Sequence, residues 1–401
     1  MGAALADVVV VDLTTEYWGS LGAALLADFG ARVIRVEDLG RGRVAPRAPR
    51  ALHPDARYDY DADLVQRNKQ GLALDLDDPS GRELLHALVA KADLLFTDWP
   101  ADRLEALGLD PAGATRLRAD LVYTRGSGFG PKGPDRELPP LDELAAARTG
   151  MMPILPQPGE PPVYAGAGPL YTAALLALGS LVALVHRQRT GEGQEVDASL
   201  YSGNLYGASL DLQAFLAMGG DRLTQPVART DAGNPMSGVL YPAKDGRWLC
   251  LTMPDTDRWW PGLAGVMGLA VDDPRFDSHE KRCGEYRLEL IRVLEERFAC
   301  HDGEHWRARF VEARLSADVI EDFEHPATDP QARRNRYVLE LERPGAGTIR
   351  TLGFPIFMSE TPARLDRFAP CAGQHSAEIL HGLLGLGEAR IQELVERGVV
   401  A

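Results

Sequence analysis

The first 130 residues alternate between short apolar runs and helix-like segments, and this alternation constrains the fold more than any other feature. The run VVVVDL at 8–13 predicts a buried strand, residues 20–30 predict a helix ended by Gly30, and residues 31–38 predict a second strand. Further strands are predicted at 71–76, 93–99 and 120–130, with a helix at 79–92. Regular strand and helix alternation predicts an α/β fold, in which a parallel sheet is covered by helices on both faces.

The sequence changes character between about 225 and 330. The stretch VLYPAKDGRWLCLTM predicts a two-stranded hairpin that turns at Asp245-Gly246, and helices are predicted at 284–299 and 303–315. We therefore expect a smaller α+β domain at 225–330. The tail HSAEILHGLLGLGEARIQELVERGVV is helical again, and we expect it to pack back against the first domain.

The charge and the cysteines limit the partners. A formal net charge of -15 and a pI near 5.1 argue against nucleic acid or an anionic membrane as the main partner, because both are polyanions. We therefore expect small-molecule ligands. The four cysteines never form a CxxC pair, so they predict buried free thiols and neither a metal site nor a disulfide framework.

Two segments bear on the location of the protein. The opening MGAALADVVVVDL has no basic segment and leads directly into a predicted strand, which argues against a signal peptide and favours the cytoplasm. The apolar run at 169–185 is at the lower limit of a membrane span and contains Thr172, Gly179 and Ser180. A helix buried in a soluble core explains this run better than a membrane span does.

The first predicted strand, helix and strand also need a test for dinucleotide binding. Glu37 stands at the end of the second strand, where a dinucleotide-binding fold holds a ribose. The turn DLTTEYWGSLG, however, lacks the GxGxxG pattern, and Tyr17 and Trp18 occupy positions where the backbone must approach a pyrophosphate. The sequence therefore argues against a nicotinamide or flavin cofactor.

Seven segments in order resemble the family III CoA-transferases, the superfamily that includes the carnitine and formyl-CoA transferases and the alpha-methylacyl-CoA racemases. The segments are LLADFGARVIRVED, RNKQGLALDLDDPSGRELLHALVAKADLLFTDW, LEALGLD, LVYTRGSGFGPKGP, RTGEGQEVDASLY, DGRW and GQHSAEILHGLLGLGEARIQELVERGVV. Each segment alone is weak, but together they cover nearly the whole chain.

This resemblance implies an architecture and a chemistry. It implies a Rossmann-like large domain built from residues 1–224 and 331–401, with the small domain at 225–330 between them, in an interlocked, ring-like homodimer or heterodimer. Transferases of this family attack an acyl-CoA thioester with an aspartate, form a mixed anhydride and then an aspartyl-CoA thioester, and pass CoA to a carboxylic acid acceptor. Coenzyme A or acyl-CoA is thus implied as the substrate.

The resemblance also assigns contacts for CoA. Asn68 and Lys69 match the family's NK pair, whose lysine can meet the nucleotide phosphates. Trp99 matches an aromatic or apolar position beside the adenine, and Leu107 lies in the matching turn. The loop that approaches the pantetheine or the thioester is matched by Ser127, Gly128 and Phe129.

The family's nucleophilic aspartate is missing from its expected position. It should follow a glycine just before the apolar helix, and this chain has Gly168-Pro169 there, with no Asp or Glu anywhere from 161 to 191. The histidine that racemases of the family pair with this aspartate is replaced by Leu141. Proline in the first turn of a helix is structurally favourable, but it supplies no nucleophile.

The surroundings of the missing aspartate suggest a reshaped substrate pocket. Tyr17 and Trp18 replace a small loop of the family beside the acyl group, and Tyr171 adjoins Pro169. Asp142, just ahead of a predicted helix, is the candidate catalytic residue, although a capping role also fits it. Three functions stay open: an acyl-CoA enzyme of this superfamily, a non-catalytic subunit of a heteromeric transferase, and an acyl-CoA-binding protein without turnover.

Overall fold

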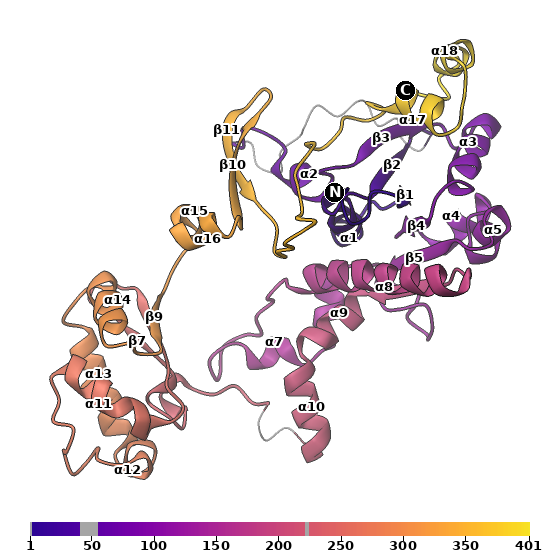
Figure 1. The fold of residues 1–401 in the computed structure, drawn as a ribbon. Coiled ribbons are helices and arrows are strands. Elements are labelled where there is room, and N and C mark those ends of the chain that lie inside the picture. Colours follow the sequence, from indigo (N-terminus) through magenta and orange to yellow (C-terminus); the bar gives the residue numbers. More distant parts are fainter. Residues whose placement is uncertain (1, 41–54, 221–223) are drawn as a thin grey trace. The chain divides into compact units, whose positions relative to one another are not determined.

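A computed structural model describes residues 2–40, 55–220 and 224–401 (Figure 1). Contacts within the chain group it into two compact units. The large unit comprises Met1–Met151, Tyr164–Ala217 and Arg333–Ala401, and the small unit comprises Met152–Val163 and Met218–Ala332. Each unit is described separately, and the domain boundaries expected from the sequence remain predictions.

The large unit is built on a six-stranded sheet in the order β3-β2-β1-β4-β5-β6, in which all neighbouring strands are parallel. This confirms the predicted parallel sheet. The order reverses between β1 and β4, and ligands of open α/β sheets bind outside the carboxyl ends at such a point. The strands are β1 (Val9–Asp12), β2 (Arg32–Asp38), β3 (Gln70–Leu74), β4 (Leu94–Thr97), β5 (Val122–Ser127) and β6 (Glu195–Ser199).

Helices pack on both faces of this sheet, as the sequence predicts (Figure 1). On one face, α1 (Tyr17–Asp28) and α8 (Gly168–Thr190) bury apolar side chains against strand residues such as Phe96 and Val122. The other face is covered by α3 (Pro79–Val89), α4 (Ala101–Ala106), α5 (Pro111–Leu117), α17 (Ser376–Gly382) and α18 (Glu388–Glu396). The C-terminal helices therefore share one core with the N-terminal strands, which confirms that the tail packs back on the first part of the chain.

Shorter elements complete the large unit and the connections between the units. A two-stranded antiparallel ribbon is formed by β10 (Val338–Arg343) and β11 (Gly347–Leu352). The remaining helices are α2 (Tyr60–Val65), α6 (Asp142–Ala146), α7 (Met151–Ile154), α9 (Leu200–Gly207), α10 (Ser209–Met218) and α16 (Pro330–Arg334).

The small unit combines a three-stranded antiparallel sheet with helices. Strands β7 (Ser237–Pro242) and β8 (Trp248–Thr252) form the predicted hairpin, and Gly246 takes the positive φ of 85° that its turn requires. The core is aromatic, with Trp260, Phe298 and Phe310 buried. The other elements are β9 (Ala317–Ile320), α11 (Thr256–Met267), α12 (His279–Cys283), α13 (Arg287–Phe298), α14 (Gly303–Glu312), α15 (Glu324–Thr328) and the 3-10 turn Arg229–Asp231.

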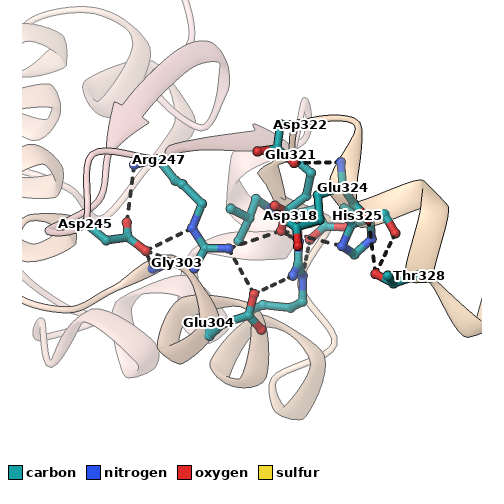
Figure 2. Close-up of polar contacts among 12 residues, drawn as sticks. Asp245, Arg247, Gly303, Glu304, Asp318, Glu321, Asp322, Glu324, His325 and Thr328 are labelled. Carbon is teal, nitrogen blue, oxygen red and sulfur yellow. Dashed lines mark hydrogen bonds and ion pairs between the residues drawn. The ribbon is translucent and has the colours of Figure 1, made fainter. Parts of the chain in front are cut away.

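A network of charged side chains joins the hairpin to the helices of the small unit (Figure 2). Arg247 contacts Asp245 at 2.9 Å and Glu304 at 3.0 Å. Arg307 also contacts Glu304, at 2.7 Å, and it pairs with Glu321. Every side chain of this network is at least 18% exposed, so the network lies at the surface of the unit.

Two sequence expectations need correction. Helix α8 is long and apolar enough to cross a membrane; one side of it packs in the core against the sheet, as expected, but only 39% of its most apolar stretch is buried, so the rest of the helix is not in the core. A single helix of this kind is weak evidence for a membrane span. The four cysteines are free thiols, as expected, but none is fully buried, and Cys300 and Cys371 are exposed.

Candidate functional site

The carboxyl ends of β1 and β4 meet at the point where the strand order reverses. Asp98, directly after β4, accepts hydrogen bonds from the amides of Thr15 at 2.9 Å and Glu16 at 2.8 Å, which follow β1. Burial raises the pKa of Asp98 to about 7, although these hydrogen bonds favour the charged form. The backbone N–H groups of the turn between β1 and α1 are therefore bonded to a carboxyl group of the protein itself.

Lys69 lies inside the large unit. Its side chain is 0% exposed, and its Nζ donates to Asp12 Oδ2 at 2.6 Å and to the carbonyl oxygen of Ser20 at 2.9 Å. Burial lowers the pKa of Lys69, whereas the charge of Asp12 opposes that shift. The expected contact with nucleotide phosphates requires this ammonium group at the surface, so the structure contradicts that expectation.

Asn68 connects distant parts of the large unit. It adopts a positive φ of 64°, which Asn tolerates better than most residues. Its Nδ2 donates to Asp28 Oδ1 and to the carbonyl oxygen of Arg364, both at 2.8 Å, and its Oδ1 accepts from the amide of Asp366 at 2.7 Å. These contacts give Asn68 a structural role in addition to the CoA contact that remains predicted.

Trp99 and Leu107 both belong to the core on the α3 face of the sheet. The Trp99 side chain is 3% exposed, and the guanidinium of Arg103 lies 3.6 Å from its ring centroid. The indole Nε1 is buried and has no hydrogen-bond partner among the residues described. Leu107 ends α4, and its carbonyl oxygen lies 2.7 Å from His86 Nε2.

The loop after β5 contains Ser127, Gly128 and Phe129 and leads from the sheet toward α6 and α9. Ser127 Oγ accepts from the amide of Gly130 at 3.1 Å, and the Gly128 carbonyl accepts from the amide of Tyr201 at 3.0 Å. A Cβ atom on Gly128 would lie 2.9 Å from the Cα of Pro140, so the loop needs glycine there. The loop thereby fixes the segment that leads into Asp142.

Asp142 lies against the first turn of α8. It is 7% exposed, and its carboxylate accepts hydrogen bonds from Asn204 Nδ2 at 2.7 Å and from the hydroxyl of Tyr164. A Cβ atom on Gly168 would lie 2.1 Å from Asp142 Oδ1, so the carboxylate touches the residue that precedes Pro169. The positive end of the α8 dipole favours a negative charge at this position. Sequence reasoning named Asp142 but missed Asn204, which lies 62 residues away from Asp142.

The residues expected to reshape the substrate pocket lie in different environments. Trp18 is 3% exposed and packs on Gly126, where a Cβ atom would lie 2.0 Å from the indole ring. Trp18 is therefore a core residue, contrary to the expectation of a pocket residue, because the missing side chain at Gly126 leaves room for the indole. Tyr17 and Tyr171 are 40% and 43% exposed.

Tyr17 lines a cavity of about 210 Å³ near the carboxyl end of β2. Burial raises the pKa of Tyr17 and that of Asp61, which also lines the cavity. Other lining side chains come from β2 and from the C-terminal part of the chain, including Arg35, Arg343 and Cys371. Sequence reasoning did not predict this cavity, because its walls come from segments more than 300 residues apart.

Comparison with known proteins places these features in a family. Residues 5–376 match the family described as CoA-transferase family III. A succinyl-CoA--D-citramalate CoA-transferase of Chloroflexus aurantiacus is 31% identical over 404 residues, covering 99% of this chain and 98% of the relative. A succinyl-CoA:mesaconate CoA-transferase of Haloarcula hispanica is 31% identical over 412 residues, covering 98% and 99%.

Solved structures have the same fold. A CaiB/BaiF family protein from Brucella suis superposes with a TM-score of 0.82 at 24% identity, covering 96% of this chain and 100% of that chain. The protein Rv3272 from Mycobacterium tuberculosis superposes with a TM-score of 0.76 at 25% identity, covering 94% and 99%.

Proposed function

Because this chain belongs to CoA-transferase family III, we propose that it transfers coenzyme A from an acyl-CoA thioester to a free carboxylic acid. Relatives that align over nearly their full length are CoA-transferases with different donors and acceptors. The small-molecule ligands expected from the sequence agree with such substrates. The transfer reaction is therefore favoured over a non-catalytic subunit or a binding protein without turnover.

We assign the nucleophile to Asp142, since Pro169 cannot act as one. The observation that carries this assignment is the contact between the Asp142 carboxylate and Gly168 at the start of α8. In this position the carboxylate lies beside the residue that precedes Pro169, the position where the resemblance places the family's aspartate. Asn204 and Tyr164 hold it in one orientation, which is what a nucleophile in a precise attack geometry requires.

The proposed reaction proceeds through four acyl transfers, two that move CoA from the donor to Asp142 and two that move it from Asp142 to the acceptor. An Asp142 oxygen attacks the thioester carbonyl, the C–S bond breaks, and an acyl anhydride and CoA thiolate form. The thiolate attacks the Asp142 carbonyl carbon, which releases the donor carboxylate and leaves an Asp142-CoA thioester. The acceptor carboxylate attacks this thioester to give a new anhydride and thiolate. Attack of the thiolate on the acceptor's carbonyl then gives the new acyl-CoA and regenerates the Asp142 carboxylate.

Exposed apolar side chains support a dimeric assembly. On α8, Leu178 and Val182 are 58% and 59% exposed, and on α10, Leu210 and Leu216 are 81% and 62% exposed. Apolar surface of this kind marks protein interaction sites. We propose that a second copy or a homologous chain covers it in an interlocked dimer; sedimentation that finds a stable 43.6 kDa monomer contradicts this proposal. The cytoplasmic location expected from the sequence stays a prediction.

The function is tested with the pure protein and pairs of acyl-CoAs and carboxylic acids, with mass spectrometry of products and of peptides. We expect a new acyl-CoA and a CoA thioester on Asp142. Asp142→Asn removes the nucleophile and should lower the rate at least ~1000-fold, whereas Glu143→Gln, an exposed neighbour, is the matched control. An adduct on another residue would overturn the assignment of Asp142. Failure of every donor and acceptor pair would overturn the proposed reaction.

A further inference from the structure

Three polar side chains lie in a row across the carboxyl half of the large sheet. Arg125 on β5 pairs directly with Thr97 on β4 and with Asp197 on β6. Residues paired across neighbouring strands project from the same face. Tyr123, two residues before Arg125, belongs to the core that contains Trp99, so this row lies on the α3 face, opposite α1 and α8.

Burial raises the pKa of Asp197, and the Arg125 side chain lies near enough to oppose that rise, but the two side chains form no ion pair. Arg125 is half-buried, and within the ranges that the structure describes it makes no hydrogen bond or ion pair. Its Nε is buried without an acceptor, and so is Nε1 of Trp99 on the same face. Buried donors are almost always satisfied in native proteins, and the exceptions need an explanation such as a ligand. Two unsatisfied donors on one face indicate a ligand with acceptor oxygens.

The charges around the carboxyl ends of the strands set Arg125 apart from other cations. Lys69 is neutralised by Asp12 inside the core, and the Arg103 guanidinium that stacks on Trp99 is paired with Asp38. Arg35, in the middle of β2, is paired with Glu37 at 3.0 Å. Arg125 differs from these three cations, because its side chain forms no ion pair with any residue that the structure describes. A guanidinium in this state presents a fork that fits two oxygens of a phosphate.

We propose that Arg125 binds a phosphate group of coenzyme A, in the role that the sequence assigned to Lys69. This inference rests on the proposed function, because that function supplies a ligand with phosphates. Arg125 lies on the strand that leads into the Ser127–Phe129 loop and shares its face with Trp99. A CoA molecule bound along the carboxyl ends of the strands would extend from its phosphate at Arg125 to the Ser127–Phe129 loop, which leads into Asp142. Asp197 lies beside Arg125 and limits the local positive charge.

Calorimetry with CoA, pantetheine, butyryl-CoA and succinyl-CoA tests the proposal. We expect Arg125→Gln to weaken CoA and both acyl-CoAs about 10- to 100-fold and to leave pantetheine, which has no phosphate, unchanged. Arg125→Lys keeps the charge but not the fork, and it should recover part of the affinity. Asp197→Asn should strengthen CoA binding. Arg247→Gln, which removes an arginine of the small unit that is already paired, is the matched control and should not change it.

The outcomes separate this inference from the proposed function. A loss of affinity for succinyl-CoA alone would assign Arg125 to an acyl carboxylate and overturn the phosphate assignment. Equal losses for pantetheine and CoA, or a change below about twofold for every ligand, would also overturn it. If the wild-type protein binds CoA and Arg125→Gln weakens that binding but no transfer occurs, the inference holds and the proposed reaction fails. If the wild-type protein binds none of the four ligands, both fail.

Discussion

The large unit and the small unit each hold a set of charged side chains, and the two sets differ sharply in burial. In the large unit, Lys69 with Asp12 and Arg67 with Asp28 form ion pairs whose side chains are at most 3% exposed. In the small unit, the arginines of the network in Figure 2 share several carboxylates at the surface. An ion pair of the same kind therefore contributes differently to stability in the two sets, because water screens the surface charges and not the buried ones.

The burial and pairing of a cation help to show whether it binds a ligand. An arginine in a surface network has several partners, so the network explains it without any ligand. Lys69 and Arg67 of the large unit are each paired with one buried carboxylate, and a half-buried cation without an ion pair, such as Arg125, then stands out. The following predictions test whether the burial of a charge, and not the number of its contacts, decides its effect.

The largest effect is expected for Lys69→Met. This change leaves Asp12 buried without its cation, and removal of one partner of a buried pair typically costs about 3–5 kcal/mol of unfolding free energy. Denaturant titration measures the loss. The double variant Asp12→Asn with Lys69→Met removes both charges and should recover most of the stability. A loss of unfolding free energy below about 1 kcal/mol for the single change would show that water reaches the pair.

A smaller effect is expected from the titration of Asp98. Its pKa is about 7 in the folded protein and near its ordinary value of 3.8 in the unfolded chain, so the folded state binds the proton more tightly. The stability that this group contributes is present below about pH 4 and is lost as the pH rises through about 7. The nearby acids Asp12 and Glu16 act in the same direction.

Asp98→Asn does not titrate, so thermal unfolding of the two proteins between pH 5 and pH 8 isolates this contribution. We expect the wild type to lose on the order of 1 kcal/mol more than the variant over this range, less than the full shift implies because water and hydrogen bonds reach the carboxyl group. Parallel stability curves for the two proteins would contradict the raised pKa.

The smallest effect is expected for Arg247→Ala in the small unit. Arg247 has three carboxylate partners, but its side chain is 31% exposed and that of Glu304 is 65% exposed. Exposed pairs contribute about 0.2–1 kcal/mol each, so the network should cost about 1 kcal/mol when it loses this arginine. Salt at about 1 M should shrink the difference, because it shortens the screening length for exposed charges to about 3 Å. A cost equal to that of Lys69→Met would reject the comparison between the units.

Local patterns in the sequence were enough to predict the first five strands of the large sheet, the hairpin at Gly246 and the helices of the C-terminal tail. Each of these depends on the spacing of apolar residues or on the turn that one residue permits. The environments of Lys69 and Trp18 depend on partners at Asp12 and Gly126, which no local pattern reveals. The sequence located Asp142, but its contact with Asn204 appears only when α9 folds beside α6.

The core on the α3 face is completed only late in synthesis of the chain. Its strands are complete once β6 ends at Ser199, yet Ile379, Leu380, Ile391 and Leu394 belong to the same core. At about 5–20 residues per second, the ribosome needs roughly 10 to 40 seconds to add the residues between these two points. During that interval the outer face of β3 has not received its helices, and Leu72 and Leu74 lie on an edge strand that can pair with other chains. Slow synthesis through the small unit therefore lengthens the period in which a nascent chain is open to chaperones and to aggregation.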